Sequence, residues 1–538
     1  MKPTFPAQIR FLREKLLLFD PDSLSHKLAC LKTLSSLTLP IQLQLVSYYE
    51  MLLFLQGYPG SPEELSLVKK EIKRITALLK NRAGKPSSLF ENTGLPFSDT
   101  VGQFSHDGVR WLIRHPHLEV TLDSFEEPPL SLNDVLRLTL PTAERSETTK
   151  GFTNNELLNA LRVPGKQRLS FILNELSRFD PLPFVKDHFF DRLSLFVRLR
   201  PKHAEFSKAY NRLADVPVFY HHALVRKLDP MMILDQPLPS AIRLNAAQQE
   251  SAIRVVKNAM AITARETDPT TFMMERSFRL FHLDRGISVA IYDMIPARQL
   301  PLESYVGFTA FKNGYPAAYG GAWIFGAMAS FGLNIFETFR SGESAYVMAQ
   351  LLRTYRQVFG LTYLEIEPYQ FGLDNPEGIA SGAFWFYYRF GFRPADPDLR
   401  KKAEAEALKI RTRNGYRSSP KVLTDFTGSH LILNFSKKTP HRVLSIIPQI
   451  TSMIQRKFKG DRSLAEAVCV EKFKTKTKWT SAGTKDESVV MREVALWAEA
   501  WKIEDPLRLS AMVDMIHTKP LNVYSYQAAL KRFLSKEK

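Results

Sequence analysis

The sequence predicts an α+β protein, in which a central mixed β-sheet with helices lies between two mainly α-helical regions. Residues 333–394 give the first reason, because an apolar run, a glycine-containing turn, a helical pattern and a second apolar run follow one another. That order is typical of a βαβ unit. The second reason is Asn313-Gly314 between two alternating runs, the strongest short-range signal for a β-hairpin. Apolar spacings of three and four residues over both flanks are the third, and they indicate amphipathic helices.

The central unit can be assigned residue by residue. Leu333–Phe339 predicts a strand that stops at Arg340-Ser341-Gly342. A helix follows, with one apolar face made of Ala345, Met348, Ala349, Leu352, Tyr355 and Phe359. Leu361–Ile366 predicts a second strand, so the crossover should be right-handed and the two strands parallel. With the hairpin on one side, these strands make a mixed sheet.

The flanking regions are predicted in chain order. Ser61-Pro62-Glu63-Glu64 marks a helix start, and that helix should reach about Lys80, before the breaker residues 83–87. Val109–Ile113 and Leu118–Leu122 are predicted as short strands, and Thr153–Glu156 is a capping box that opens a further helix. The expected boundaries are a mainly helical region at 1–123, a linker at 124–150, a second mainly helical region at 151–270, a sheet-containing domain at 271–400 and a basic, mainly helical region at 401–538.

Composition narrows the class of protein. A chain of 538 residues has room for about two to four domains. No apolar run approaches the roughly 18 residues needed to span a bilayer, and the charged N-terminal stretch is a poor signal peptide. Cys30 and Cys469 are the two cysteines and cannot form a disulfide framework. His115-Pro116-His117 has two histidines without a third ligand, so no metal is expected. The predicted location is the cytoplasm.

The net charge of +18 suits nucleic acid, anionic lipid or a polyphosphate ligand, or serves only solubility. Two segments point to nucleic acid. The helix pair after Thr153, with Lys166 and Arg168 at its second start, is compatible with a helix-turn-helix, although two packed helices of a helical domain produce the same pattern more often. The run EKFKTKTKWT, residues 471–480, is compatible with stacking on single strands or with an edge strand protected by lysines.

The end of the central unit has the most specific spacing. Ala383 is followed four residues later by Tyr387, and Gly391-Phe392 and Pro394 come after it. On this ending and on the order of elements before it, the chain from about Phe278 to Asp398 resembles the GNAT superfamily of acyl-CoA-dependent N-acyltransferases. The resemblance implies a strand that splays from its neighbour and a following loop that holds the pyrophosphate of coenzyme A. The implied substrates are acetyl-CoA or another acyl-CoA and an amine.

The loop between the strand and the helix is the implied site for the donor. The resemblance assigns donor binding to Phe339, Arg340, Ser341, Gly342, Ser344 and Ala345. Backbone amides at a helix start suit a phosphate, and Arg340 adds a charged donor although it stands one residue later than the family pattern. Glu343 stabilises the empty helix through the macrodipole. It would repel a phosphate if it faced inward.

Acyl transfer to an amine needs a neutral amine, a stabilised oxyanion and a protonated leaving thiolate. The resemblance makes Tyr387 the candidate general acid, and the alternative is a core aromatic residue. The candidate bases are Glu337 on the strand before the loop and Glu365 and Glu367 on the strand after the helix. Glu365 and Glu367 share one face of a strand, and a buried pair of carboxylates would raise the pKa of one of them.

Two further functions are compatible with the sequence, and the first is a transferase with a different donor. The polar segment 368–381 is longer than the usual connection between these elements of the family, and it predicts a substrate lid or specificity loop. In this respect the chain is similar to the larger peptidyl- and aminoacyl-transferring relatives, whose donor is an aminoacylated tRNA. The other alternative is a non-catalytic basic protein that binds nucleic acid or a partner on the same scaffold.

Overall fold

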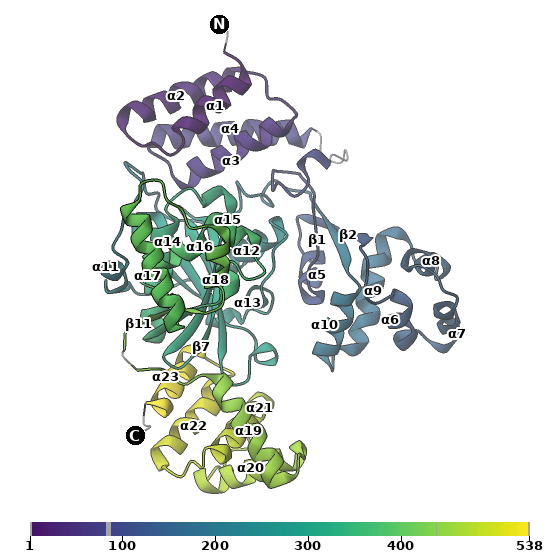
Figure 1. Cartoon of the computed structure of the whole chain (residues 1–538). Helices are drawn as coiled ribbons and strands as arrows, with labels where there is room; N and C mark the ends of the chain where they lie inside the picture. Colours follow the sequence, from purple (N-terminus) through teal and green to yellow (C-terminus); the bar gives the residue numbers. More distant parts are fainter. Residues whose placement is uncertain (1–2, 82–87, 437, 536–538) are drawn as a thin grey trace. The chain divides into compact units, whose positions relative to one another are not determined.

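The computed structural model describes residues 3–81, 88–436 and 438–535 (Figure 1). The breaker residues 83–87 lie outside the described residues. The chain divides into two units. Unit 1 contains Met1–Leu224, Leu244–Thr271 and Phe311–Pro316, and unit 2 contains Val225–Arg243, Phe272–Ala310 and Ala317–Lys538. Both units combine helices with a sheet, so the predicted α+β class is confirmed.

Unit 1 begins with four helices, α1 (Phe5–Lys15), α2 (Pro21–Ser36), α3 (Leu43–Gly57) and α4 (Pro62–Lys80). The helix predicted from Ser61 is confirmed as α4. Ser61 Oγ accepts a hydrogen bond from the Glu64 amide at 3.1 Å, and proline occupies the first turn. Leu65, Val68 and Ile72 lie on the buried face of this helix.

The rest of unit 1 surrounds a three-stranded antiparallel sheet of order β1-β3-β2. Its strands are β1 (Thr100–Gly102), β2 (Leu118–Phe125) and β3 (Leu195–Pro201). The helices are α5 (His106–Ile113), α6 (Leu132–Thr139), α7 (Thr142–Arg145), α8 (Asn154–Ala160), α9 (Arg168–Leu176), α10 (Pro183–Arg192), α12 (Ala246–Ile262) and α13 (Asp268–Thr271).

Two sequence interpretations in unit 1 need correction. Val109–Ile113 belongs to helix α5 and is not a strand, because Ser105 caps a helix there and Val109 and Leu112 fall on its one buried face. Segment 124–150, expected as a linker, contains α6, whose Leu136 is fully buried. The nearby prolines and polar residues hid this short amphipathic helix. Leu118–Leu122 lies within strand β2, as predicted.

Unit 2 contains an eight-stranded mixed sheet of order β10-β11-β9-β8-β7-β6-β5-β4. The strands are β4 (Arg279–His282), β5 (Ile287–Tyr292), β6 (Ser304–Lys312), β7 (Tyr315–Phe325), β8 (Met328–Ile335), β9 (Tyr363–Ile366), β10 (Arg393–Pro394) and β11 (Leu431–Asn434). The Asn313-Gly314 turn between β6 and β7 has φ of 48° and 83°, as the predicted hairpin requires. Strands β8 and β9 run parallel, whereas β7 and β8 are antiparallel.

Helix α14 (Ser344–Phe359) connects β8 to β9 and packs on one face of the sheet. The Tyr355 ring lies edge-on against Phe308 and Phe331, with centroids 5.9 and 5.3 Å away. Its hydroxyl donates to the Val306 carbonyl at 2.9 Å. Gly360 ends the helix in the left-handed region, with φ of 60°.

The remaining helices of unit 2 are α11 (Pro230–Leu234), α15 (Pro376–Ser381), α16 (Ala383–Arg389), α17 (Pro397–Thr412), α18 (Pro420–Phe426), α19 (Val443–Phe458), α20 (Arg462–Thr477), α21 (Lys485–Ala500), α22 (Pro506–Thr518) and α23 (Val523–Leu534). Helices α19–α23 lie together at the C-terminal end of the chain (Figure 1). They share a core around the fully buried Trp497, which contacts Phe533. Among the described residues, no helix is long and apolar enough to cross a membrane.

Candidate active site

The parallel pairing of β8 and β9 is short. It covers Met328, Ala329 and Ser330, which lie opposite Tyr363, Leu364 and Glu365. Strand β8 continues to Ile335, beyond the last of these pairs. There the Leu333 amide donates to Gln370 Oε1 at 3.3 Å, and the Ile335 carbonyl accepts from Arg340 Nε at 3.1 Å. Side chains therefore take the hydrogen bonds that a longer β9 would have made.

A half-buried aromatic surface lies beside this edge. The rings of Tyr305 and Trp323 are stacked, with centroids 4.3 Å apart and an interplanar angle of 4°. Gly321 lies two residues before Trp323 on β7, and a Cβ there would come within 2.6 Å of the Tyr305 ring. Gly321 is opposite Gly332 of β8, and a Cβ on Gly332 would be 3.3 Å from Gln370 Nε2. The two glycines thus leave room for the Tyr305 ring and the Gln370 side chain against the sheet.

The six residues expected to bind the donor lie together at the start of α14. Phe339 is buried at the end of a 3₁₀ turn, η8 (Glu337–Phe339), and accepts a hydrogen bond from the Gly342 amide at 3.0 Å. Ser344 Oγ donates to the Arg340 carbonyl at 2.8 Å. The guanidinium of Arg340 is exposed and forms an ion pair with Glu377. The turn is ordered by its own hydrogen bonds before any ligand binds.

Glu343 faces the interior and is only 1% exposed. Its carboxylate accepts hydrogen bonds from the Val225 amide at 2.9 Å and from Arg285 Nε at 3.0 Å. Because Arg285 balances its charge, Glu343 repels an anion at the helix start much less than an unpaired carboxylate would.

Arg226 supplies an exposed cation to the same turn. Its guanidinium donates to the carbonyls of Ser341 and Gly342 at 3.0 and 3.3 Å. An exposed guanidinium beside the amides of a helix N-terminus is suited to a phosphate. Arg226 and Arg285 escaped the sequence interpretation because each is more than 50 residues from the loop and belongs to no motif.

Tyr387 lies on α16, is 4% exposed and contacts Phe386 and Phe392. Burial raises its pKa well above the ordinary range of a tyrosine, so the phenol keeps its proton at physiological pH. Such a group is a hydrogen-bond donor and a poor source of a transferred proton. The neighbouring Tyr388 is less buried and lies under the guanidinium of Arg393, 3.7 Å from the ring centroid. Gly391 has φ of +94°, which explains the need for glycine there.

The three candidate carboxylates differ from the expectation. Glu337 is not on the strand but in the turn η8, where it is exposed. Glu367 is exposed at the start of a second 3₁₀ turn, η9 (Pro368–Phe371), and accepts a hydrogen bond from Ser330 Oγ at 3.3 Å. Glu365 alone is buried, so the expected buried pair does not form.

Glu365 forms ion pairs with Arg442 and His430. His430 Nδ1 lies 2.7 Å from its Oε1. Burial favours a raised pKa for Glu365, but the hydrogen bond from His430 and the charge of Arg442 prevail and lower it. The same hydrogen bond raises the pKa of His430. A carboxylate with a lowered pKa is a weak base, so Glu365 is better suited to a structural role.

Glu303 is a carboxylate that the sequence interpretation missed. It is half-buried just before β6, and burial raises its pKa, which the charge of Lys519 opposes and that of Glu367 assists. Burial also raises the pKa of nearby Asp293 to about 7, and burial lowers the pKa of Lys519 to about 8 against the charge of Glu493. A raised pKa is what a general base near neutral pH requires. Lys519 lies some 200 residues away in sequence, so no local pattern could reveal this environment.

The segments that suggested nucleic-acid binding are largely engaged within the fold. Arg168 of α9 hydrogen bonds with Asn155 and Asn159 of α8, and the opposite face of α9 is buried. Residues 471–477 belong to α20, so the interpretation as an edge strand is wrong. Phe473 is buried, and Trp479 is stacked on His517 with centroids 4.8 Å apart.

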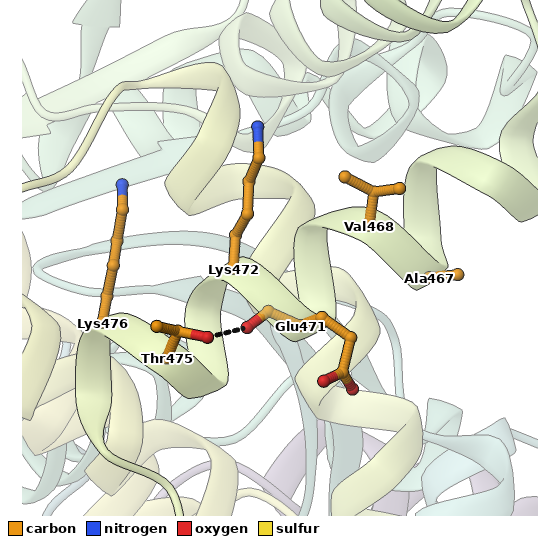
Figure 2. A pocket seen from close by; sticks show the side chains of 6 residues that line it. All are labelled: Ala467, Val468, Glu471, Lys472, Thr475 and Lys476. Carbon is orange, nitrogen blue, oxygen red and sulfur yellow. Dashed lines mark hydrogen bonds between the residues drawn. The ribbon is translucent and has the colours of Figure 1, made fainter.

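One face of α20 borders a hollow of about 570 Å³ (Figure 2). Lys472 and Lys476 extend side by side from this helix, whereas Glu471 points away from them (Figure 2). Each lysine already lies near a carboxylate, Lys472 3.3 Å from Glu499 and Lys476 2.6 Å from Glu504. The hollow has no convergent set of reactive groups, and we place the candidate active site at the β8 edge.

Comparison of the chain with protein-family models, with curated proteins and with solved structures returns no match. The structure itself defines the class: an α+β protein whose mixed sheet has a short parallel strand pair, followed by a turn at a helix start that carries an exposed arginine.

Replacing Glu365 by glutamine should lower the free energy of unfolding by about 1–3 kcal/mol, because Arg442 and His430 lose a buried charged acceptor. The lowered pKa of Glu365 makes its contribution present above the ordinary value of 4.5 and lost as the pH falls through the folded pKa. The raised pKa of His430 makes its contribution present below 6.5 and lost as the pH rises through the folded pKa.

Urea unfolding of Glu365→Gln at pH 5.5 and pH 8.5 therefore should show the larger loss at pH 5.5. The difference between the two pH values should not exceed about 1 kcal/mol, because His430 is partly solvated. The exposed neighbour Glu367→Gln is the control and should change stability by less than about 0.5 kcal/mol. A larger loss at pH 8.5 would contradict the assignment.

Proposed function

We propose that this chain is an N-acyltransferase that moves an acyl group from an acyl-CoA to an amine, with its active site at the β8 edge. The observation that carries the proposal is the parallel β8–β9 pair that ends at Ser330 and leaves β8 to the side chains of Gln370 and Arg340. A strand edge of this kind binds extended chains that contain amides.

An acyl-CoA has the matching parts in the matching order. Its flexible arm contains two amides, a thioester ends the arm, and a pyrophosphate stands at the other end. In the proposed complex the amides replace Gln370 at Leu333 and Arg340 at Ile335. Because β8 leads into the helix-start turn, the pyrophosphate then lies near Arg226, Ser341 and the first amides of α14.

The same orientation directs the thioester toward Ser330, where the strands rejoin. Glu367 contacts Ser330 there, and its charge acts on Glu303. In the proposed reaction Glu303 takes a proton from the ammonium group of the acceptor. The neutral nitrogen attacks the thioester carbon, the C–S bond breaks, and the sulfur leaves as a thiolate that accepts a hydrogen bond from Tyr387. The attacking nitrogen loses its second proton to solvent as the amide forms, and the thiolate takes a proton from solvent to become the thiol.

The aromatic surface favours an acceptor with a flat or apolar part beside its amine. Tyr305 and Trp323 present a stacked, half-buried pair on the same side of the sheet as Gly321 and Ser330. An aromatic face also attracts a cation before the amine is deprotonated.

An aminoacylated tRNA is the second candidate donor. It is favoured by the ion pair between Arg340 and Glu377, which occupies the loop arginine, and by the net charge of +18. Such a donor carries an ester in place of the thioester, and its phosphates would contact a larger basic area.

Titration calorimetry with acetyl-CoA tests the main proposal. The wild-type chain should bind one equivalent, and Arg226→Ala should weaken binding about tenfold, because one charged hydrogen bond is lost. If acetyl-CoA and longer acyl-CoAs do not bind but aminoacyl-tRNA binds in a salt-dependent way, the donor is an aminoacyl-tRNA and not an acyl-CoA. Absence of both would leave the basic interaction protein as the better function.

Replacing Gln370 by alanine should tighten acetyl-CoA binding about twofold to tenfold. The variant removes a side chain that competes for the Leu333 amide, and a neutral hydrogen bond of this kind is worth about 0.5–1.5 kcal/mol. Gln449→Ala on α19 is a matched control, because Gln449 is exposed and its side chain donates to the Ser445 carbonyl of its own helix. Weaker binding by Gln370→Ala would contradict displacement of Gln370 by the donor.

Replacing Tyr387 by phenylalanine should slow acyl transfer about a hundredfold, the usual effect of losing one hydrogen-bond donor at a reacting centre. The ring contacts remain, so thermal unfolding should change little. Tyr388→Phe is the control and should retain full turnover. The assay is thiol release from acetyl-CoA with a panel of primary amines. Equal rates for the two variants would show that Tyr387 has only a packing role in the core.

A further inference from the structure

A cluster of histidine and carboxylate side chains lies in unit 1, far in sequence from the proposed active site. His117 immediately precedes β2, and His203 and Glu205 follow the end of β3. Strands β2 and β3 are antiparallel, and Leu118 lies opposite Pro201. The ladder continues one step further, because the Lys202 amide donates to the His117 carbonyl at 2.7 Å. Strand register therefore brings His117 next to His203, although 86 positions separate them in sequence.

The geometry of the three side chains is that of a small cation site. One ligand atom from each of His117, His203 and Glu205 lies within 4.8 Å of the others. His117 Nε2 is 3.4 Å and His203 Nδ1 is 3.9 Å from Glu205 Oε2. Ligands that surround a zinc ion tetrahedrally at about 2.1 Å are separated by about 3.4 Å. The His117–Glu205 distance already has this value, and a small rotation of an exposed side chain brings His203 to it.

The backbone around the cluster is held in place. The amide of His117 donates to Nδ1 of the buried His115 at 3.2 Å, which orders the turn before β2. The imidazole rings of His117 and His203 are stacked, with centroids 4.9 Å apart and an interplanar angle of 30°. Rings in this arrangement can each direct one nitrogen toward the same ion. Glu205 and His203 are exposed, so an ion can enter from solvent.

We propose that His117, His203 and Glu205 bind a Zn²⁺ ion, with water as the fourth ligand. Imidazole nitrogen with one carboxylate is a donor set that zinc accepts, whereas Mg²⁺ and Ca²⁺ require oxygen ligands. The ion joins the start of β2 to the turn after β3.

The test is calorimetric titration of the full-length chain, free of any affinity tag, with ZnCl₂ in the presence of excess Mg²⁺. One Zn²⁺ should bind per chain, and the melting temperature should rise with Zn²⁺ concentration as mass action requires. His203→Ala and Glu205→Gln should each weaken Zn²⁺ binding at least tenfold. His222→Ala removes an exposed histidine of the same unit and should leave the affinity unchanged.

Co²⁺ provides a second readout that does not depend on stability. In the wild-type chain it should give the intense visible absorption of a tetrahedral site, and His117→Ala should abolish that absorption. The proposal would be overturned if the wild-type chain failed to bind one Zn²⁺. It would also be overturned if His203→Ala and Glu205→Gln bound Zn²⁺ with the affinity of the wild-type chain. Because the cluster belongs to the other unit, neither result affects the test with acetyl-CoA.

Discussion

The parallel pairing of β8 and β9 is the constraint on which the sheet of unit 2 depends. Two parallel neighbours cannot be joined by a tight turn, so a crossover helix must connect them. Helix α14 does so, and Tyr355 holds it to the sheet through Phe308, Phe331 and the Val306 carbonyl. The helix start, and with it the turn at Arg340–Glu343, is consequently held at the end of β8.

The charges near that turn follow from the same constraint. A helix start carries a partial positive charge, which favours Glu343 at the N-cap position of α14. Burial of this carboxylate would be costly without a partner, and Arg285 provides one at 3.0 Å. Arg226 follows Val225, whose amide donates to Glu343, and its exposed guanidinium donates to the Ser341 carbonyl of the turn. The fold thus separates a buried, balanced ion pair from an exposed arginine that remains available to a ligand.

Elements with a local signal could be predicted from the sequence. The hairpin at Asn313-Gly314 and the helix start at Ser61 are set by positive φ and by a cap, which depend on neighbouring residues alone. The apolar face of α14 was equally legible. The alternating lysines of α20 misled because a period of two in charge says little when the buried positions, such as Cys469 and Phe473, follow a helical spacing.

The candidate site was less predictable, because its environments are made by residues far apart in sequence. Alternation placed Glu365 and Glu367 on one side of a strand but could not show that β9 ends between them. Burial raises the pKa of Glu303, and the charges of Lys519 and Glu367 modify it, while the cluster of His117, His203 and Glu205 depends on the register of β2 and β3. None of these partners is within 50 residues in sequence.

The side chains on the β8 edge also explain how a binding edge can persist without a ligand. An uncovered strand edge invites pairing with other chains. Gln370 and Arg340 satisfy Leu333 and Ile335 internally, each with one hydrogen bond worth about 1 kcal/mol. In the proposed complex, a donor that offers amides in the same places would replace these bonds at almost no net cost. The edge is therefore protected in the absence of a ligand. In the proposed complex, modest additional contacts at Arg226 and the helix start are enough for a ligand to displace Gln370 and Arg340.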